Sequence, residues 1–87
     1  MVDVKDETDV GEPIRKNTRE VIRVRLATFN GIRCLDCRTY FEREPGDFQP
    51  SKKGFACSPT LIPVLIERLE EAWKVWQSES EQAQPKE

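Results

Sequence analysis

Two runs of alternating apolar and polar residues, rich in β-branched and aromatic side chains, occupy the segment REVIRVRLATFNGIRCLDCRTYF (residues 19–41). The dipeptide Asn30-Gly31 separates the two runs. It predicts a β-hairpin, because a type I′ turn needs positive φ at both central residues, and Asn and Gly adopt such a conformation readily. A two-residue turn at this point also fixes which residues of the two strands lie opposite each other.

The predicted register separates an apolar face from a charged face. The apolar face, expected to form the core, pairs Leu26 with Leu35, Val24 with Cys37, and Ile22 with Thr39. The second face, expected to point outward, pairs Arg25 with Asp36, Ala27 with Cys34, and Arg23 with Arg38. Arginine opposite arginine is unfavourable by up to about 1 kcal/mol unless an anion lies between the two. This pairing therefore indicates either two side chains that splay into water or an anion-binding surface.

Turn residues at Pro45-Gly46 and at 51–54 divide the next segment into two short strands, expected around residues 47–50 and 55–57. The second turn would place Lys52 and Lys53 at a rim of the sheet. With the hairpin, these segments predict a sheet of four antiparallel strands.

After Cys57 the apolar period becomes helical. Ser58 suits the N-cap and Pro59 the first helical position, whereas Pro63 is expected to make the first turn irregular, because it lacks an N–H and its ring crowds the carbonyl of Pro59. The apolar stripe comprises Leu61, Ile62, Leu65, Ile66, Leu69, Ala72, Trp73 and Trp76. Leu61, Leu65 and Leu69 are expected to pack in the core, and the tryptophans either there or against a second subunit.

Composition limits the folded part of the chain. Residues 1–16 are predicted to be a disordered acidic leader and residues 77–87 a disordered polar tail, since neither has apolar periodicity. Residues 17–76 then form the single folded domain. So small a core favours a homodimer.

Charge is strongly segregated along the chain. From Ile14 to Gly54 there are ten Lys or Arg residues against five Asp or Glu, although the whole chain carries −2. A basic middle flanked by acidic ends indicates an anionic partner for the middle.

Catalytic and metal-binding chemistry is not expected. The sequence has no histidine and no glycine-rich phosphate loop, so we expect no enzyme. Cys34 and Cys37 lie three apart on a strand and point to opposite faces, and Cys57 makes only a third thiol, whereas a structural zinc site needs four ligands. We therefore expect no metal, no cofactor and reduced thiols.

Two motifs, in this order, resemble the positive cofactor four family of transcriptional coactivators. FNGIRCLDCRTYF (29–41) is similar to the family's Phe-x-Gly turn and the strand that ends Asp-x-Arg-x-Tyr-Trp. QPSKKGFACSP (49–59) is similar to its Lys-Pro-Gly-Arg-Lys-Gly-Ile-Ser-Leu segment and helix start. The resemblance runs through residues 29–59 without a gap and, more weakly, from about 21 to about 72.

The resemblance implies an α+β fold, with a four-stranded antiparallel sheet followed by one C-terminal helix, and a homodimer formed through the helices. It also implies binding of single-stranded DNA with little sequence preference. Arg38 would contact phosphates, and Phe41 stands where the family has a base-stacking tryptophan. Taken with the outward arginines, the expected nucleic-acid contacts are Arg23, Arg25, Phe29, Asn30, Arg38, Phe41, Lys52 and Lys53. The expected dimer interface is Leu65, Leu69, Trp73 and Trp76.

The sequence departs from this family at the hairpin tip, where Asn30 and Ile32 replace lysines. Arg23 and Arg25 are candidates to compensate. If Arg23, Arg25, Arg38, Lys52 and Lys53 all neutralise phosphates, the log–log salt slope of binding is about −3.5 per subunit.

The expected function is therefore single-stranded DNA binding in transcription, repair or replication, with transcription machinery as a further partner. Two alternatives stay open: RNA as the ligand, and a protein-interaction module that binds nucleic acid weakly or not at all. Without a signal peptide or a membrane-spanning stretch, we expect a cytoplasmic protein, nucleoid-associated if bacterial.

Overall fold

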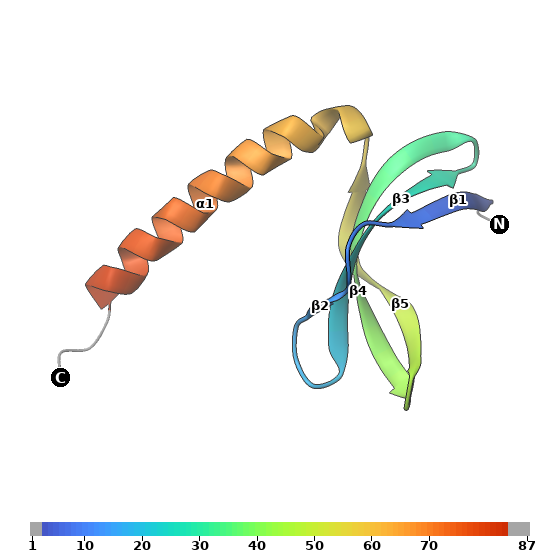
Figure 1. The fold of residues 1–87 in the computed structure, drawn as a ribbon, viewed down its shortest axis with the longest axis horizontal. Helices are drawn as coiled ribbons and strands as arrows, with labels where there is room; N and C mark the ends of the chain where they lie inside the picture. The colour runs from blue at the N-terminus through green and yellow to red at the C-terminus, as the bar shows by residue number, and fades with distance from the viewer. Residues whose placement is uncertain (1–2, 84–87) are drawn as a thin grey trace.

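The computed structural model describes residues 3–83 and has one antiparallel sheet and one long helix (Figure 1). In chain order the elements are β1 (Val4–Asp9), β2 (Ile14–Arg15), β3 (Glu20–Phe29), β4 (Ile32–Glu44), β5 (Asp47–Cys57), a 3₁₀ turn (Pro59–Leu61) and α1 (Ile62–Ala83). The strands lie in the order β1-β3-β4-β5, and β2 also pairs with β3. The predicted fold class is confirmed, with five strands in place of four.

The β3–β4 hairpin has the predicted register. Leu26 lies opposite Leu35 and Arg23 opposite Arg38, and every other pair follows the same alignment. Asn30 and Gly31 have φ values of 49° and 84°, as a type I′ turn requires.

The two short strands expected after β4 are one continuous strand, β5. The turn predicted at residues 51–54 is wrong: Arg38 pairs with Gly54 and Tyr40 with Pro50, so residues 51–53 bulge opposite Thr39 alone. The Ser51 hydroxyl donates to the Thr39 carbonyl at 2.7 Å and accepts from the Lys53 N–H at 3.0 Å. The Ser51 hydroxyl thus satisfies one backbone group on each side of the bulge. Because of these bonds, β5 can continue through the bulge instead of turning.

Gly54 ends this bulge and is expected to tolerate no side chain. Its φ is 150°, and a Cβ there would lie 2.4 Å from the Cys37 carbonyl oxygen. Gly54→Ala should lower the free energy of unfolding by about 1–3 kcal/mol or more, because both the backbone and the contact are strained. Thermal unfolding monitored by circular dichroism measures this. The control is Gly46→Ala. Gly46 has a φ of 81°, but a Cβ there would meet nothing within 4 Å, so this variant measures the cost of backbone strain without the clash.

The predicted disorder of residues 1–16 is wrong for the residues that the structure describes. β1 and β2 both pair with β3 along its edge. The Asp3 N–H donates to the Asn30 side-chain oxygen at 2.8 Å, and the Asn30 N–H donates back to the Asp3 carbonyl at 2.8 Å. Composition favoured disorder because the segment is acidic and lacks apolar periodicity, but its acidic side chains pair with arginines on β3.

The C-terminal boundary also differs from the prediction. Residues 77–83, expected in the disordered tail, continue α1, and residues 84–87 lie outside the described residues. The segment QSESEQA contains no Gly or Pro and is rich in helix-forming Gln, Glu and Ala, so its polarity does not prevent it from extending the helix.

The helix begins as expected, with an irregular first turn. The Ser58 side chain accepts from the Thr60 N–H at 3.3 Å, and Pro59 starts a 3₁₀ turn. The Ile62 N–H bonds to the Pro59 carbonyl, which an N–H at Pro63 would have bonded in a regular α-helix.

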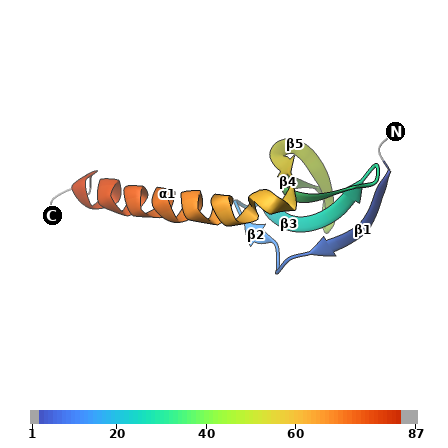
Figure 2. The same cartoon turned by 90° about the horizontal axis from the view of Figure 1, so that it is seen from above.

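α1 projects away from the sheet and covers neither of its faces (Figures 1 and 2). The radius of gyration is 16.2 Å, whereas a compact chain of this length has about 12 Å. The predicted packing of Leu61 and Leu69 in a core of the same chain is therefore wrong: they are 48% and 66% exposed. The face of the sheet predicted as core is also only partly covered, since Ile22, Val24 and Leu26 are all half-buried.

Candidate nucleic-acid interface

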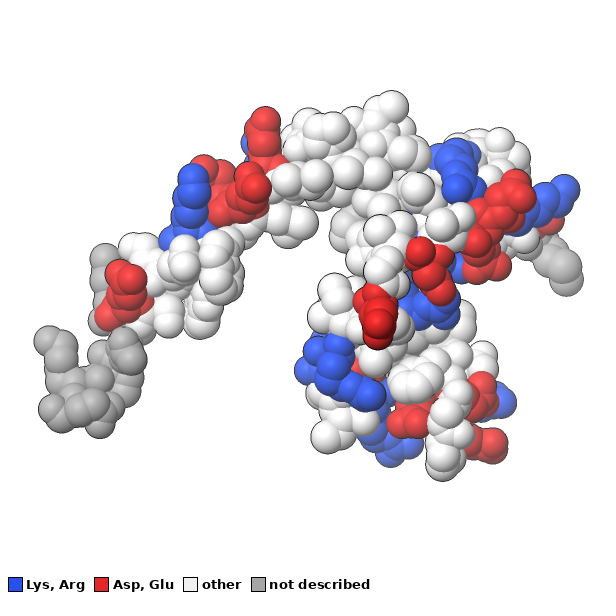
Figure 3. Space-filling view, in the orientation of Figure 1, with Lys and Arg blue, Asp and Glu red and all other residues white. Residues whose placement is uncertain are grey.

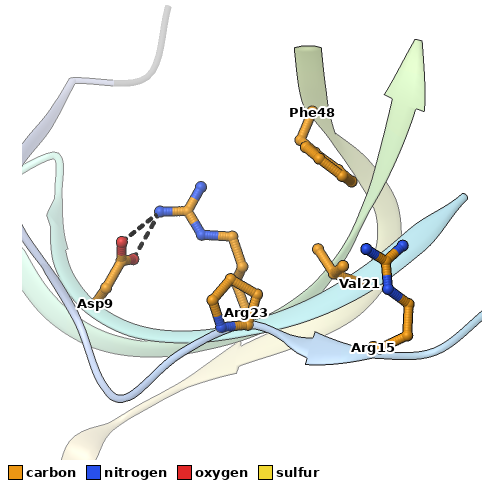
Figure 4. A pocket seen from close by; sticks show the side chains of 6 residues that line it. Asp9, Arg15, Val21, Arg23 and Phe48 are labelled. Carbon is orange, nitrogen blue, oxygen red and sulfur yellow. Dashed lines mark hydrogen bonds and ion pairs between the residues drawn. The ribbon is translucent and has the colours of Figure 1, made fainter. Parts of the chain in front are cut away.

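The strands curl so that Val21, Arg23 and Phe48 project into the hollow of the sheet (Figure 4). By strand alternation, Arg25 and, on β4, Asp36, Arg38 and Tyr40 share this inner face. It was predicted to point outward, but Arg25 and Asp36 are among the most buried residues of the described chain, at 9% and 0% exposure. The curvature explains the difference, because side chains on the inner side of a curled sheet cover one another.

Asp36 is the centre of a buried charge network. Its carboxylate accepts from Arg25 Nε at 3.1 Å, and from Arg38 Nε and Nη2 at 3.1 and 2.9 Å. Arg38 Nη1 also donates to the Ser51 carbonyl at 3.1 Å, which ties the network to the bulge in β5. Arg25 and Asp36, predicted to lie opposite each other, therefore form an ion pair. The facing arginines 23 and 38 do not need a bound anion, because Arg23 pairs with Asp9 and Arg38 with Asp36.

Arg38 thus has a structural role that sequence reasoning did not foresee. It was expected to contact phosphates, but three of its nitrogens bond within the protein and its side chain is only 24% exposed. The signal was present in the Asp-x-Arg spacing, because residues two apart on a strand share a face.

Aromatic rings support the arginines of the inner face. The Arg23 guanidinium lies 4.6 Å from the centroid of Tyr40, and that of Arg25 lies 5.6 Å from the centroid of Phe29. Both distances are within the range of cation–π attraction. Tyr40 was missed in the sequence, although the hairpin register places it on the same face as Arg23.

Phe41 lies on the opposite, outer face, so the structure does not bring it together with Arg23 and Arg25. It pairs with Glu20 and Gln49 across the sheet and is 36% exposed. On the same side, Lys53 Nζ lies 3.9 Å from the Glu20 carboxylate. The Asn17 amide donates to Glu20 at 2.7 Å and, more than the nearby lysines, lowers the pKa of that carboxyl. Lys52 is exposed on the bulge.

The acidic strand β1 neutralises part of the inner face. Glu7 pairs with Arg25, and both carboxylate oxygens of Asp9 accept from Arg23 Nη2 at 2.7 Å. The hydrogen bond that Arg23 donates to Asp9 raises the pKa of Arg23 above its usual value. Figure 3 accordingly shows acidic and basic side chains interspersed over the sheet. At the hairpin tip, the predicted contact Asn30 already bonds to Asp3.

The three cysteines are free thiols spread over the sheet. Cys34 pairs with Ala27, and Cys37 with Val24 on the other face. Burial, more than the neighbouring Asp36 and Cys57, raises the pKa of the Cys37 thiol. Within residues 3–83, no group of three or more His, Cys, Asp or Glu side chains could hold a metal ion. No helix in this range is long and apolar enough to cross a membrane.

A curled antiparallel sheet with arginines and aromatic rings on its inner face, followed by one long projecting helix, defines a class of small α+β proteins. The chain belongs to the transcriptional coactivator p15 (PC4) family, which matches residues 16–68, more than half of its length. The matched family is one of coactivators and not of enzymes.

Solved structures agree with this assignment. A PC4 homolog from Burkholderia pseudomallei is 25% identical, with a TM-score of 0.70 over 77% of this chain and 97% of that one. A second crystal form of the same protein gives 28% identity and a TM-score of 0.66, over 70% and 82% of the two chains. A bacteriophage T5 homolog of the eukaryotic coactivator PC4, described as implicated in recombination-dependent DNA replication, shares the fold at 23% identity and a TM-score of 0.55, over 88% and 83%. No curated protein matches the sequence significantly.

Proposed function

We propose that this protein binds single-stranded DNA with little sequence preference, as a homodimer, and acts without catalysis in transcription or in DNA repair and replication. Members of the PC4 family bind single-stranded DNA, and this chain belongs to that family. The observation that carries the proposal is the pairing of Arg23 with Tyr40 and of Arg25 with Phe29 on one face. Cations neutralise phosphates, and rings stack on bases of any identity.

We keep the nucleic-acid contacts predicted from the sequence, but the structure changes the role proposed for some of them. Arg23, Arg25 and Phe29 lie on the inner face. Lys52 on the bulge, and Lys53 and Phe41 on the outer side, add two cations and a ring. Arg38 and Asn30 act as positioning residues, because all three guanidinium nitrogens of Arg38 and the side-chain oxygen of Asn30 bond within the chain. Among the described residues, the hydrogen bonds of Arg23 and Arg25 leave one terminal nitrogen of each unused. The four remaining cations reduce the expected salt slope to about −2.8 per subunit.

Dimerisation is proposed from the exposed apolar stripe of α1. Leu69, Trp73 and Trp76 are 66%, 59% and 56% exposed in the single chain, and Leu65 is half-buried. Ile66, Leu69 and Trp73 line a groove along the helix. A contiguous apolar surface of this kind on a single chain is typical of an interface, and the proposed partner is the same helix of a second copy.

The acidic strand β1 is expected to weaken binding, because Glu7 competes with phosphate for Arg25. Glu7→Gln should raise affinity for a 20-nucleotide oligo-dT about threefold to tenfold at low salt, through release of Arg25 and removal of a like charge from the DNA path. Fluorescence anisotropy measures the change. Glu12→Gln makes the same charge change in the same segment, at a residue for which the described structure gives no ion pair, and should have little effect. Equal effects of the two variants would contradict the competition.

The same assay tests the proposed function against its alternatives. Oligo-dT, oligo-rU and a blunt duplex of equal length are titrated in parallel. Tightest binding of oligo-dT supports the proposal, and tighter binding of oligo-rU makes RNA the ligand. The protein-interaction alternative is favoured by the carboxylates that cover Arg23 and Arg25. It predicts weak binding of all three probes, together with partners that stay bound to the protein in a nuclease-treated cytoplasmic extract.

A further inference from the structure

A cavity of about 380 Å³ opens on the inner face of the sheet, between the N-terminal segment and β5. It is lined by Asp9, Pro13, Arg15, Val21, Arg23 and Phe48 (Figure 4). The volume lies at the small end of the range for ligand sites. Asp9, Pro13 and Arg15 precede residue 16, where the match to the family begins, so half of the lining belongs to a segment outside that match.

The lining combines an apolar surface with two guanidinium groups. Phe48 projects from β5 toward Val21 and Arg23 across the hollow, and Arg15 extends from β2 on the side away from Asp9 (Figure 4). Phe48 and Val21, with Pro13, offer the ring and aliphatic surface on which a flat heterocycle can lie. Arg15 Nη1 donates to the carbonyls of Asn17 and Thr18 at 3.2 and 3.4 Å, which fixes the guanidinium. Its Nε and Nη2 can hold a phosphate group with two hydrogen bonds.

Arg23 is held in place in the lining of this cavity. Tyr40 supports its guanidinium on one side, and its bonds to Asp9 use Nη2 alone. The other terminal nitrogen points away from Asp9 (Figure 4). A donor fixed in this way adds polar recognition at the edge of a bound heterocycle without losing side-chain entropy on binding.

From this arrangement we propose that the cavity takes up one nucleobase of a bound single strand, stacked on Phe48, with its adjacent phosphate on Arg15. The inference rests on the proposed function and adds a base-binding site to it. The N-terminal segment then has two effects: Glu7 competes with the strand at Arg25, whereas Pro13 and Arg15 complete the base site.

The test compares a 20-nucleotide oligo-dT with an abasic 20-mer that has the same phosphates and no bases. Phe48→Ala should weaken binding of oligo-dT roughly 5- to 150-fold, the loss expected for one stacked base, and leave the affinity for the abasic strand within about twofold. Phe48→Tyr keeps the ring and should bind oligo-dT like the wild type. Arg15→Gln should weaken binding of both oligonucleotides. Arg43 lies outside the cavity, so Arg43→Gln should weaken binding of each oligonucleotide less.

The possible outcomes are distinct. If the wild type binds neither strand, the proposed function fails. If the wild type prefers oligo-dT but Phe48→Ala does not reduce that preference, the base site is wrong and the proposed function stands. Equal losses for both strands with Phe48→Ala would also overturn the site.

A second measurement uses the wild-type protein and so does not depend on how a variant folds. Photocrosslinking of an oligo-dT that contains 4-thiothymidine, followed by peptide mapping, should label the segments around residues 13–15 and 47–49. Labelling confined to the outer face, around Phe41 and Phe55, would overturn the proposal.

Discussion

Asp36→Asn is expected to lower the free energy of unfolding by about 3–5 kcal/mol, because it leaves two arginines on the inner face without their shared counter-charge. Asp36 is fully buried and accepts from both Arg25 and Arg38. For a domain of this size, the loss corresponds to a fall in Tm of roughly 12 °C or more. Thermal unfolding at one fixed protein concentration measures it, since dimerisation makes Tm depend on concentration.

The matched control is Asp47→Asn. Asp47 pairs with Arg43 at 3.4 Å, but both side chains are substantially exposed. Exposed pairs contribute at most about 1 kcal/mol, so the control should shift Tm by only a few degrees. If Asp36→Asn is as stable as Asp47→Asn, the buried network around Asp36 does not stabilise the pairing of β3 with β4.

Leu69→Asp is expected to weaken dimerisation about 30- to 1,000-fold, because it places a charge at the centre of the apolar stripe of α1. In the single chain this residue is 66% exposed and lies on a helix that covers neither face of the sheet, so the substitution should leave the fold of the sheet intact. Analytical ultracentrifugation over a range of protein concentrations measures the dissociation constant.

Ser78→Asp is the matched control for this prediction. It adds the same charge to the same helix, nine residues further along, which places it on the opposite side of α1. This variant should dimerise like the wild type. A wild-type mass close to one chain at micromolar concentration would contradict the dimer, and equal weakening by both variants would contradict the assigned face.

The hairpin could be predicted from the sequence because a local signal, Asn30-Gly31, sets a register that alternation then extends along both strands. The start of the helix was likewise encoded locally, at Ser58 and Pro59. The family motifs lie in these same segments, so the fold class could be predicted from the sequence.

The roles of individual arginines could not be predicted in the same way. Alternation shows that Arg25 and Arg38 share a face, but not that the sheet curls and buries that face around Asp36. The bulge at Ser51 was hidden because Lys52-Lys53-Gly54 also suits a turn. Strand β1 was missed because its stability comes from charges on β3, distant in the sequence, and not from its own composition.

The most direct test of the proposed function is the salt dependence of oligo-dT binding. A labelled 20-mer is titrated at several salt concentrations with the wild type and with a variant that carries Lys52→Gln and Lys53→Gln. We predict submicromolar binding at low salt and a log–log slope of about −2.8 per subunit, falling to about −1.4 in the variant as two phosphate contacts are lost. The proposed function would be contradicted if the wild type bound oligo-dT no more tightly than an unrelated acidic protein does, or if the slope were the same in the variant.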